Sequence, residues 1–244
     1  MAEVTYEVWK SKELSAKYLT GVRGAIPFAA EQIDIMMRVI QESGMHVAAF
    51  LDLGCGNGIL AASILKTYPQ ASAVLLDFSE PMIQAAKQKL SAYAGNVDCV
   101  TFDYSDKRWV GKMQGKAPFD LIVSGFSIHH QPDSRKREIY AELFELLSAG
   151  GLFLNLEHVL PASELGHLLF DSYFIDSLYE MHHKTDPTIS REKVAAEYLN
   201  RDDKAANKLA PVETQCKWLR QIGYREVDCY FKVFELALFG GRKP

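Results

Sequence analysis

A glycine-rich turn follows the first short apolar run of the chain and restricts the folds open to it. The run Ala49–Leu53 ends in Gly54-Cys-Gly-Asn-Gly58, and an apolar helical stretch, Ile59–Tyr68, follows at once. Glycines at such a junction let the backbone adopt left-handed conformations and approach a ligand closely. A strand, a glycine-rich turn and a helix in succession are typical of open α/β sheets, which bind ligands beyond the carboxyl ends of their strands. The sequence therefore predicts an α/β domain with a ligand site at this turn.

Short apolar runs separated by helical stretches continue along the chain. Four further strands are predicted, at Ala73–Leu76, Val97–Phe102, Phe119–Ser124 and Leu152–Leu156. Strands that alternate with helices in this way call for a parallel sheet covered on both faces. The last two runs, Glu226–Tyr230 and Val233–Phe239, lie too close together for a crossover helix and must pair as an antiparallel hairpin. We expect a seven-stranded, mostly parallel sheet that ends in this hairpin.

Two segments do not follow the alternation of strands and helices. Residues 158–210 are helical in pattern but rich in His, Tyr and Asp, which predicts an inserted helical cap. Residues 1–47 precede the first strand and are interpreted as an N-terminal helical lid. A chain of 244 residues accommodates one large α/β domain with such additions, so we expect a single domain over residues 1–244.

The composition of the chain limits the classes of partner and the cellular locations that we expect. The net charge of −4 gives no basic excess for neutralising phosphates, which argues against nucleic acid and favours a small molecule. No stretch approaches the roughly 18 apolar residues of a membrane span, and the first residues lack a signal pattern. The four cysteines are scattered, so a cytoplasmic protein is expected. The histidines show no metal-binding spacing, so no metal is expected.

Acidic residues stand at the carboxyl ends of three consecutive predicted strands: Asp52 beside the glycine turn, Asp77 at the end of the second strand and Asp103 at the end of the third. A dinucleotide-binding dehydrogenase would show Gly-x-Gly-x-x-Gly, whereas this turn reads Gly-x-Gly-x-Gly with Asp52 inside it. A carboxylate there would repel a pyrophosphate and suits a cationic ligand. An acid at the end of the second strand can accept hydrogen bonds from ribose hydroxyls.

These motifs resemble the class I S-adenosylmethionine (SAM)-dependent methyltransferases. The motifs are Asp52-Leu-Gly-Cys-Gly-Asn-Gly58, Asp77-Phe-Ser-Glu-Pro-Met82, Phe102-Asp103 and Phe119-Asp-Leu-Ile-Val-Ser124. The resemblance implies a Rossmann-like fold and an enzyme that uses SAM and leaves S-adenosylhomocysteine. It also implies contacts by Asp52, Gly54 and Gly56 at the methionine end, Asp77 at the ribose and Asp103 at the adenine. From their positions in the sequence, Phe78 and Met82 can flank the adenine and Arg23 can reach the SAM carboxylate. Tyr104 and Ser124 are further candidates for cofactor binding.

Fewer sequence motifs indicate which residues contact the methyl acceptor. The loop after the fourth strand carries His129 and His130, which are candidates for catalysis or for a structural turn. We assign acceptor contacts to Tyr6, Trp9, His158 and Tyr173. Methyl transfer from a sulfonium is an in-line displacement, so positioning supplies much of its acceleration.

Three further stretches resemble carboxy-S-adenosylmethionine synthases, which make a modified SAM used at the tRNA wobble uridine. These are Arg23-Gly-Ala-Ile-Pro27, Leu165-Gly-His-Leu-Leu-Phe170 and Val212-Glu-Thr214. That group carries an arginine in the following helix, where this chain has Trp218, with Arg220 nearby. Tryptophan cannot form the bidentate pair that arginine makes with a carboxylate, so we expect ordinary methyl transfer to a small molecule. A carboxy-SAM synthase-like enzyme, a non-catalytic SAM-binding protein and a homodimer stay open.

Overall fold

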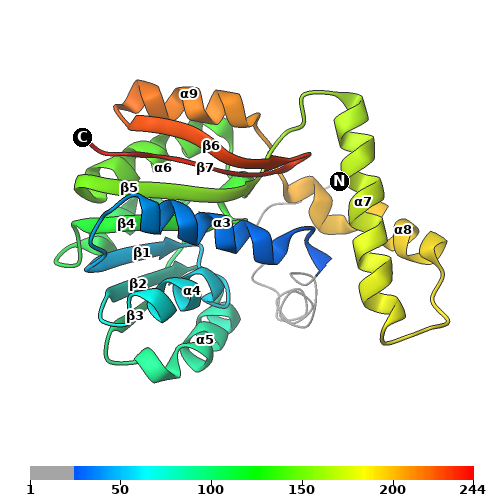
Figure 1. Ribbon diagram of the computed structural model, residues 1–244, viewed down its shortest axis with the longest axis horizontal. Helices are drawn as coiled ribbons and strands as arrows, with labels where there is room; N and C mark the ends of the chain where they lie inside the picture. Colours follow the sequence, from blue (N-terminus) through cyan, green and yellow to red (C-terminus); the bar gives the residue numbers. More distant parts are fainter. Residues whose placement is uncertain (1–24) are drawn as a thin grey trace.

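Seven strands form one sheet in residues 25–244, the part of the chain that the computed structural model describes (Figure 1). They are β1 (Ala49–Leu53), β2 (Ser72–Asp77), β3 (Val97–Thr101), β4 (Phe119–Gly125), β5 (Leu147–His158), β6 (Arg225–Val233) and β7 (Leu236–Arg242). Their order in the sheet is β3-β2-β1-β4-β5-β7-β6. Neighbours among β1 to β5 pair in parallel, whereas β7 is antiparallel to both β5 and β6. The predicted seven-stranded, mostly parallel sheet with a terminal hairpin is confirmed.

Two local predictions about this sheet need correction. The predicted strand Leu152–Leu156 is too short: β5 begins directly after the preceding helix, at Leu147, and includes Gly150 and Gly151. The hairpin turn was expected near Phe231-Lys232, yet it lies at Phe234-Glu235. A two-residue hairpin turn favours positive φ, and Phe234 adopts φ +50 although it is not glycine. The turn contains no glycine or asparagine, so no residue of these types marks its position in the sequence.

Helices cover both faces of the sheet, as the alternation predicts. Successive strand residues point to opposite faces: Phe50 packs with α3 (Ala29–Glu42), α4 (Ile59–Thr67) and α5 (Glu80–Lys89), whereas Leu51 and Leu53 pack with α6 (Asp133–Leu146) and α9 (Val212–Ile222). Short 3₁₀ turns complete the connections at Ser91–Tyr93 (η3) and Lys107–Met113 (η4). Helix α3, within the predicted lid segment, buries Met36 and Ile40 against the sheet.

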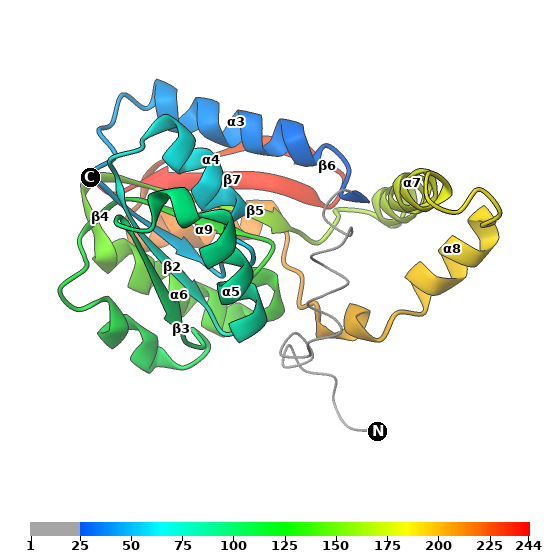
Figure 2. The same cartoon turned by 90° about the horizontal axis from the view of Figure 1, so that it is seen from below.

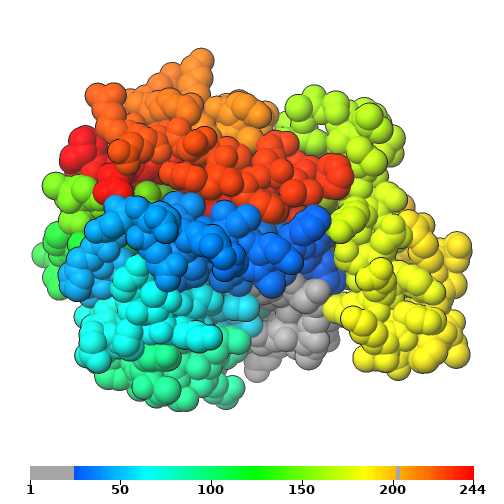
Figure 3. Space-filling view, viewed as in Figure 1, coloured from blue at the N-terminus to red at the C-terminus, as the bar shows by residue number. Residues whose placement is uncertain are grey.

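The segment after β5 stands to one side of this core. It contains α7 (Glu164–His183), α8 (Arg191–Leu199) and a 3₁₀ turn, η6 (Asp202–Ala206). Ser163 and Ser190 accept backbone N–H groups at the starts of α7 and α8, which explains where both helices begin. Both cartoon views place α7 and α8 beside the sheet, and the space-filling view shows them as a lobe at one end (Figures 2 and 3). We call α7 and α8 the cap.

The cap has its own small core, built from Ile175, Leu178, Val194 and Tyr198 together with Ala25. A second cluster of Ile26, Phe170 and Leu236 joins the cap to the hairpin. In the described part of the chain, no helix has both the length and the apolarity needed to cross a bilayer.

Candidate functional site

The glycine turn after β1 bends back over the end of β2. The backbone N–H groups of Gly54 and Cys55 both donate to the carbonyl of Leu76, at 2.7 and 3.0 Å. Gly54 has φ +68, and a Cβ on it would lie 1.9 Å from the Ser127 hydroxyl oxygen. Glycine is therefore required at this position for both backbone conformation and space.

Asp77 connects this turn to the next one. One carboxylate oxygen of Asp77 accepts from the Gly56 N–H at 2.9 Å, and the other accepts from the Ser79 N–H at 2.8 Å. The side chain lies at the end of β2, and the residue is only 7% exposed. Burial raises the pKa of Asp77 to about 6, although hydrogen bonds from the backbone of Ser79, Gly56 and Phe78 oppose this shift. The carboxylate thus fixes both turns and titrates near neutral pH.

The two turns border an open cleft at the carboxyl ends of β1, β2 and β4. Its lining residues are Gly54, Cys55, Gly56, Asn57, Asp77, Phe78, Ser79, Met82, Gly125, Phe126, Ser127 and His130. The cleft, together with the solvent at its mouth, encloses about 560 Å³ of empty space. A Cβ on Gly56 would meet no atom within 4 Å, so the turn exposes its backbone to this space.

Six predicted site residues come together here: Gly54, Gly56, Asp77, Phe78, Met82 and His130. Four other predicted cofactor residues are absent from the lining, and each has a structural contact. Asp52 is fully buried beneath the turn and accepts from the Ala61 N–H at 3.2 Å. Its position on the α4 face of β1 accounts for this, because Asp52 shares that face with Phe50. We infer that Asp52 shapes the turn.

The remaining three residues lie beside the cleft. Ser124 donates from its hydroxyl to the Leu53 carbonyl at 2.8 Å and so joins β4 to β1. Asp103 accepts from the Ser105 N–H at 2.9 Å in a local turn. The Tyr104 hydroxyl lies 2.6 Å from that of Ser127, which itself lines the cleft. Tyr104 therefore supports a cleft residue. Arg23, Tyr6 and Trp9 lie outside the described residues.

The two histidines of the 3₁₀ turn after β4, η5 (Ile128–His130), have different positions. His130 lines the cleft, and its Nδ1 lies 3.4 Å from the Ala206 carbonyl. His129 is buried, with Nδ1 2.6 Å from a carboxylate oxygen of Glu157. The His129 backbone N–H donates to the other Glu157 oxygen at 3.0 Å. Desolvation lowers the pKa of both imidazoles well below the usual range, so both are neutral at pH 7.

Because the two histidines have different surroundings, we expect their alanine variants to have different effects. His129→Ala leaves Glu157 buried without its imidazole partner, so the free energy of unfolding is expected to fall by about 1–2 kcal/mol. His130→Ala removes a half-buried ring from the cleft wall and is expected to change ligand affinity at a smaller cost in stability. Urea unfolding and calorimetric titration with SAM measure the two effects. Equal stability losses in both variants would contradict the assignment.

The structure adds site residues that the sequence patterns did not single out. Phe126 lines the cleft in a left-handed conformation (φ +51), which is uncommon for a bulky side chain. Ser79 and Ser127 also line it, and Asn57 carries a buried side-chain oxygen with no hydrogen-bond partner among the described residues. Asn57 stands inside the glycine motif, so its position was a usable signal. Phe126 had none, because its conformation depends on the packing around it.

Trp218 and Arg220 lie away from the cleft, on α9. Trp218 packs in the core on the α6 face of the sheet, with the Arg137 guanidinium 6.0 Å from its ring. Arg220 donates to the Val227 carbonyl at 2.7 Å. Among the described residues that line the cleft there is no arginine or lysine. Residues 25–244 also bring together no group of three His, Cys, Asp or Glu side chains suited to a metal ion.

Comparisons with known proteins agree with this geometry. Residues 50–151 match a family model described as a methyltransferase domain. A carboxy-S-adenosyl-L-methionine synthase from Nautilia profundicola is 21% identical over 231 residues, covering 93% of this chain and 91% of that protein. A malonyl-[acyl-carrier protein] O-methyltransferase from Halalkalibacterium halodurans is 29% identical over 134 residues, covering 55% of this chain and 42% of that protein.

Solved structures extend the likeness to the fold. Human N-acetylserotonin methyltransferase in complex with SAM gives a TM-score of 0.63 at 14% identity, covering 100% of this chain and 60% of that one. An O-methyltransferase family protein from Burkholderia thailandensis gives 0.56 at 16% identity, covering 93% and 62%. The chain thus spans about three fifths of the length of these structures.

Proposed function

Because this chain belongs to the class I SAM-dependent methyltransferases, we propose that it binds SAM in the cleft beside Asp77 and methylates a small-molecule acceptor. The observation that carries the proposal is the pair of turns fixed by Asp77 over an open cleft. In this assignment Asp77 also accepts from the ribose, Phe78 and Met82 flank the adenine, and the Gly54–Gly56 backbone faces the methionine end. Bound SAM would supply an electrophilic methyl group.

The chemistry of the cleft supports a cationic, hydrogen-bonding ligand. Asp77 is an acceptor with oxygen lone pairs beyond those used by Gly56 and Ser79. The buried Asn57 oxygen is an acceptor that lacks a hydrogen bond within residues 25–244, and burying it unpaired is costly. Both would gain donors from a ligand that carries hydroxyl or ammonium groups. The Cβ-free backbone of Gly56 leaves room for close approach.

The charges favour methyl transfer over carboxymethyl chemistry. A cofactor with an additional carboxylate needs a cation beside it. The lining residues in the described part of the chain provide none, and Arg220 is engaged with the Val227 carbonyl on α9. Carboxy-SAM synthesis remains the second candidate, because the relative from Nautilia profundicola is similar over nearly the whole chain.

We assign the protein's own catalytic contribution mainly to positioning. Phe126, Ser127 and His130 form the wall of the cleft next to β4, where the acceptor would approach. A wall that excludes water and holds two reactants in line converts a bimolecular step into an effectively unimolecular one. His130 is neutral at pH 7 because of its lowered pKa, so it can accept a hydrogen bond from an acceptor O–H or N–H. A cytoplasmic location and a homodimer stay predictions from the sequence.

Mass spectrometry of ligands released from the purified full-length protein tests this proposal, together with calorimetric titration with SAM and NAD. We expect SAM or S-adenosylhomocysteine to be released and SAM to bind. A ligand heavier than SAM by the mass of CO₂ would replace methyl transfer by carboxy-SAM synthesis. Binding of NAD without binding of SAM would reject both. Tight SAM binding with no consumption of SAM across an acceptor panel would favour a SAM-binding regulator.

A further inference from the structure

Two buried carboxylates lie where the sheet meets the cap, and the chemistry above uses neither. Glu157 is near the end of β5 and 1% exposed, and Glu235 is in the β6–β7 turn and 2% exposed. Each lies 2.6 Å from an imidazole nitrogen, Glu157 from Nδ1 of His129 and Glu235 from Nε2 of His158. Burying a carboxylate is costly unless it is paired.

The two pairs lie in a continuous series. The rings of His130 and His129 are 3.9 Å apart between centroids, and His130 reaches the cleft. The rings of His129 and His158 are 5.7 Å apart between centroids in an edge-on arrangement, and the His158 backbone N–H donates to a Glu157 carboxylate oxygen at 3.0 Å. A proton would cross between the two rings through a bridging water molecule. The second Glu235 oxygen lies 2.6 Å from Nδ1 of His167, whose side chain is 42% exposed. Titratable groups therefore extend from the cleft to the surface of α7.

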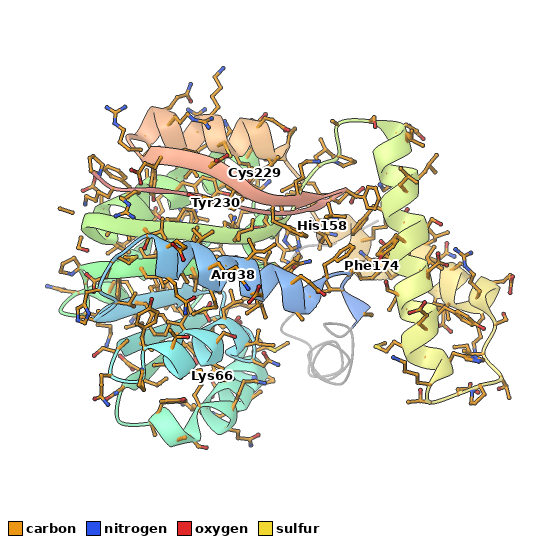
Figure 4. The ribbon with its side chains drawn as sticks, viewed as in Figure 1. Arg38, Lys66, His158, Phe174, Cys229 and Tyr230 are labelled. Atoms are coloured by element: carbon orange, nitrogen blue, oxygen red, sulfur yellow. The ribbon has the colours of Figure 1, made fainter. Side chains whose placement is uncertain are left out.

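Figure 4 shows the middle of this series. His158 extends from the end of β5 into the junction, and Phe174 extends toward it from α7. Phe170 packs against His158 at 5.3 Å and against Phe174 at 5.6 Å between ring centroids. This aromatic packing lies beside the His158–Glu235 pair, on the side of the junction formed by α7.

We propose that His130, His129–Glu157, His158–Glu235 and His167 form a proton relay between the cleft and solvent at α7. The relay rests on the proposed function for its purpose. Methylation of a neutral acceptor breaks the bond between the methyl carbon and the sulfonium sulfur of SAM, which leaves as S-adenosylhomocysteine, and forms a bond from that carbon to an O, N or S atom of the acceptor. The same acceptor atom then loses its bond to hydrogen. The released proton passes to His130, each later transfer breaks one N–H or O–H bond as it forms the next, and His167 gives the proton to water.

Local electrostatics are consistent with this role. Burial raises the pKa of Glu157 to about 7 and lowers that of His129, which removes the proton's ordinary preference for the imidazole. The positive charge of Lys136 lowers the pKa of both Glu157 and His129, and that of Arg201 lowers the pKa of His129. At the outer end Asp171 lies 3.6 Å from Nε2 of His167 and 3.5 Å from Lys204. The carboxyl group of Glu157 can therefore hold the proton between two transfers.

Exchange of histidine ring N–H groups with solvent tests the relay without cofactor or acceptor. The probe is NMR of the full-length protein carrying ¹⁵N-labelled histidine. His167→Asn closes the outer end, and we expect ring N–H exchange at His158 and His129 to slow by about tenfold or more. His182→Asn is the matched control, on the same helix but outside the series, and should leave both rates unchanged. Equal rates at His129 and His158 in His167→Asn and the wild type would overturn the proposal.

A second variant separates relay from anchoring. Glu235→Gln keeps the size of the side chain and should slow exchange at His129, which Glu235 does not touch. Slowing confined to His158, its direct partner, would indicate a local contact and overturn the relay. The free energy of unfolding, measured in urea, must match the wild type for this variant to count; otherwise His167→Asn decides. Because no SAM is present, failure here is distinct from failure of the proposed function.

Discussion

Replacing Gly54 with alanine is expected to lower the free energy of unfolding by about 3–5 kcal/mol and to abolish SAM binding. The new Cβ would lie 1.9 Å from the Ser127 hydroxyl oxygen and 2.5 Å from the Ser127 Cβ, so the η5 turn must move. Its movement breaks the 2.6 Å hydrogen bond between Ser127 and Tyr104. It also displaces part of the cleft wall. Urea unfolding and calorimetric titration with SAM measure the two losses.

Gly44→Ala is the control for the backbone contribution. Gly44 has the same φ of +68, but its Cβ would meet no atom within 4 Å. It follows α3, away from the cleft residues. Its variant should therefore lose only the cost of a left-handed alanine, about 1 kcal/mol, and keep its SAM affinity. If the two variants lose equal stability, crowding at Ser127 is not what requires glycine at position 54.

The second large effect is expected from Asp77→Asn, which should weaken SAM binding by about 2–3 kcal/mol, or roughly 30- to 150-fold. The amide keeps the shape of the side chain but directs an NH₂ group at one of the backbone donors, Gly56 or Ser79. One turn then loses its acceptor, and the ribose loses a charged one. Calorimetric titration at pH 8 measures the change. An unchanged affinity would remove Asp77 from the cofactor site.

The same carboxylate predicts a pH dependence. The pKa of Asp77 is raised to about 6 by burial, so the acceptor form is present above that pH and is lost as pH falls through it. Wild-type affinity for SAM should decline below about pH 6, whereas the Asn variant should lack this step. Asp98→Asn on β3 makes the same chemical change at an exposed position paired with Lys116. Asp98→Asn should keep both the affinity and the pH profile of the wild type.

Local patterns determined the frame of this protein. The five predicted parallel strands, the terminal hairpin and the turn at Gly54–Gly58 follow from apolar runs, helical periodicity and glycine positions, all of which act over a few residues. The place of Asp77 at the cleft was also predictable, because the carboxyl ends of parallel strands share one edge of the sheet. Such features need no information about which distant segments meet.

Only the tertiary structure decided which side chains face the cleft. Asp52 and Asp77 were both predicted to contact the cofactor, and strand alternation places both on the α4 face of the sheet. Asp52 lies inside β1 and is buried against α4, whereas Asp77 is the last residue of β2 and lines the cleft. His129 and His130 are adjacent, and they differ because Glu157, 28 residues after His129, captures one ring. Glu235 meets His158 across 77 residues because β7 pairs with β5. The sequence determined the turns and the sheet through short-range preferences, whereas the direction of each charged side chain followed from long-range pairing.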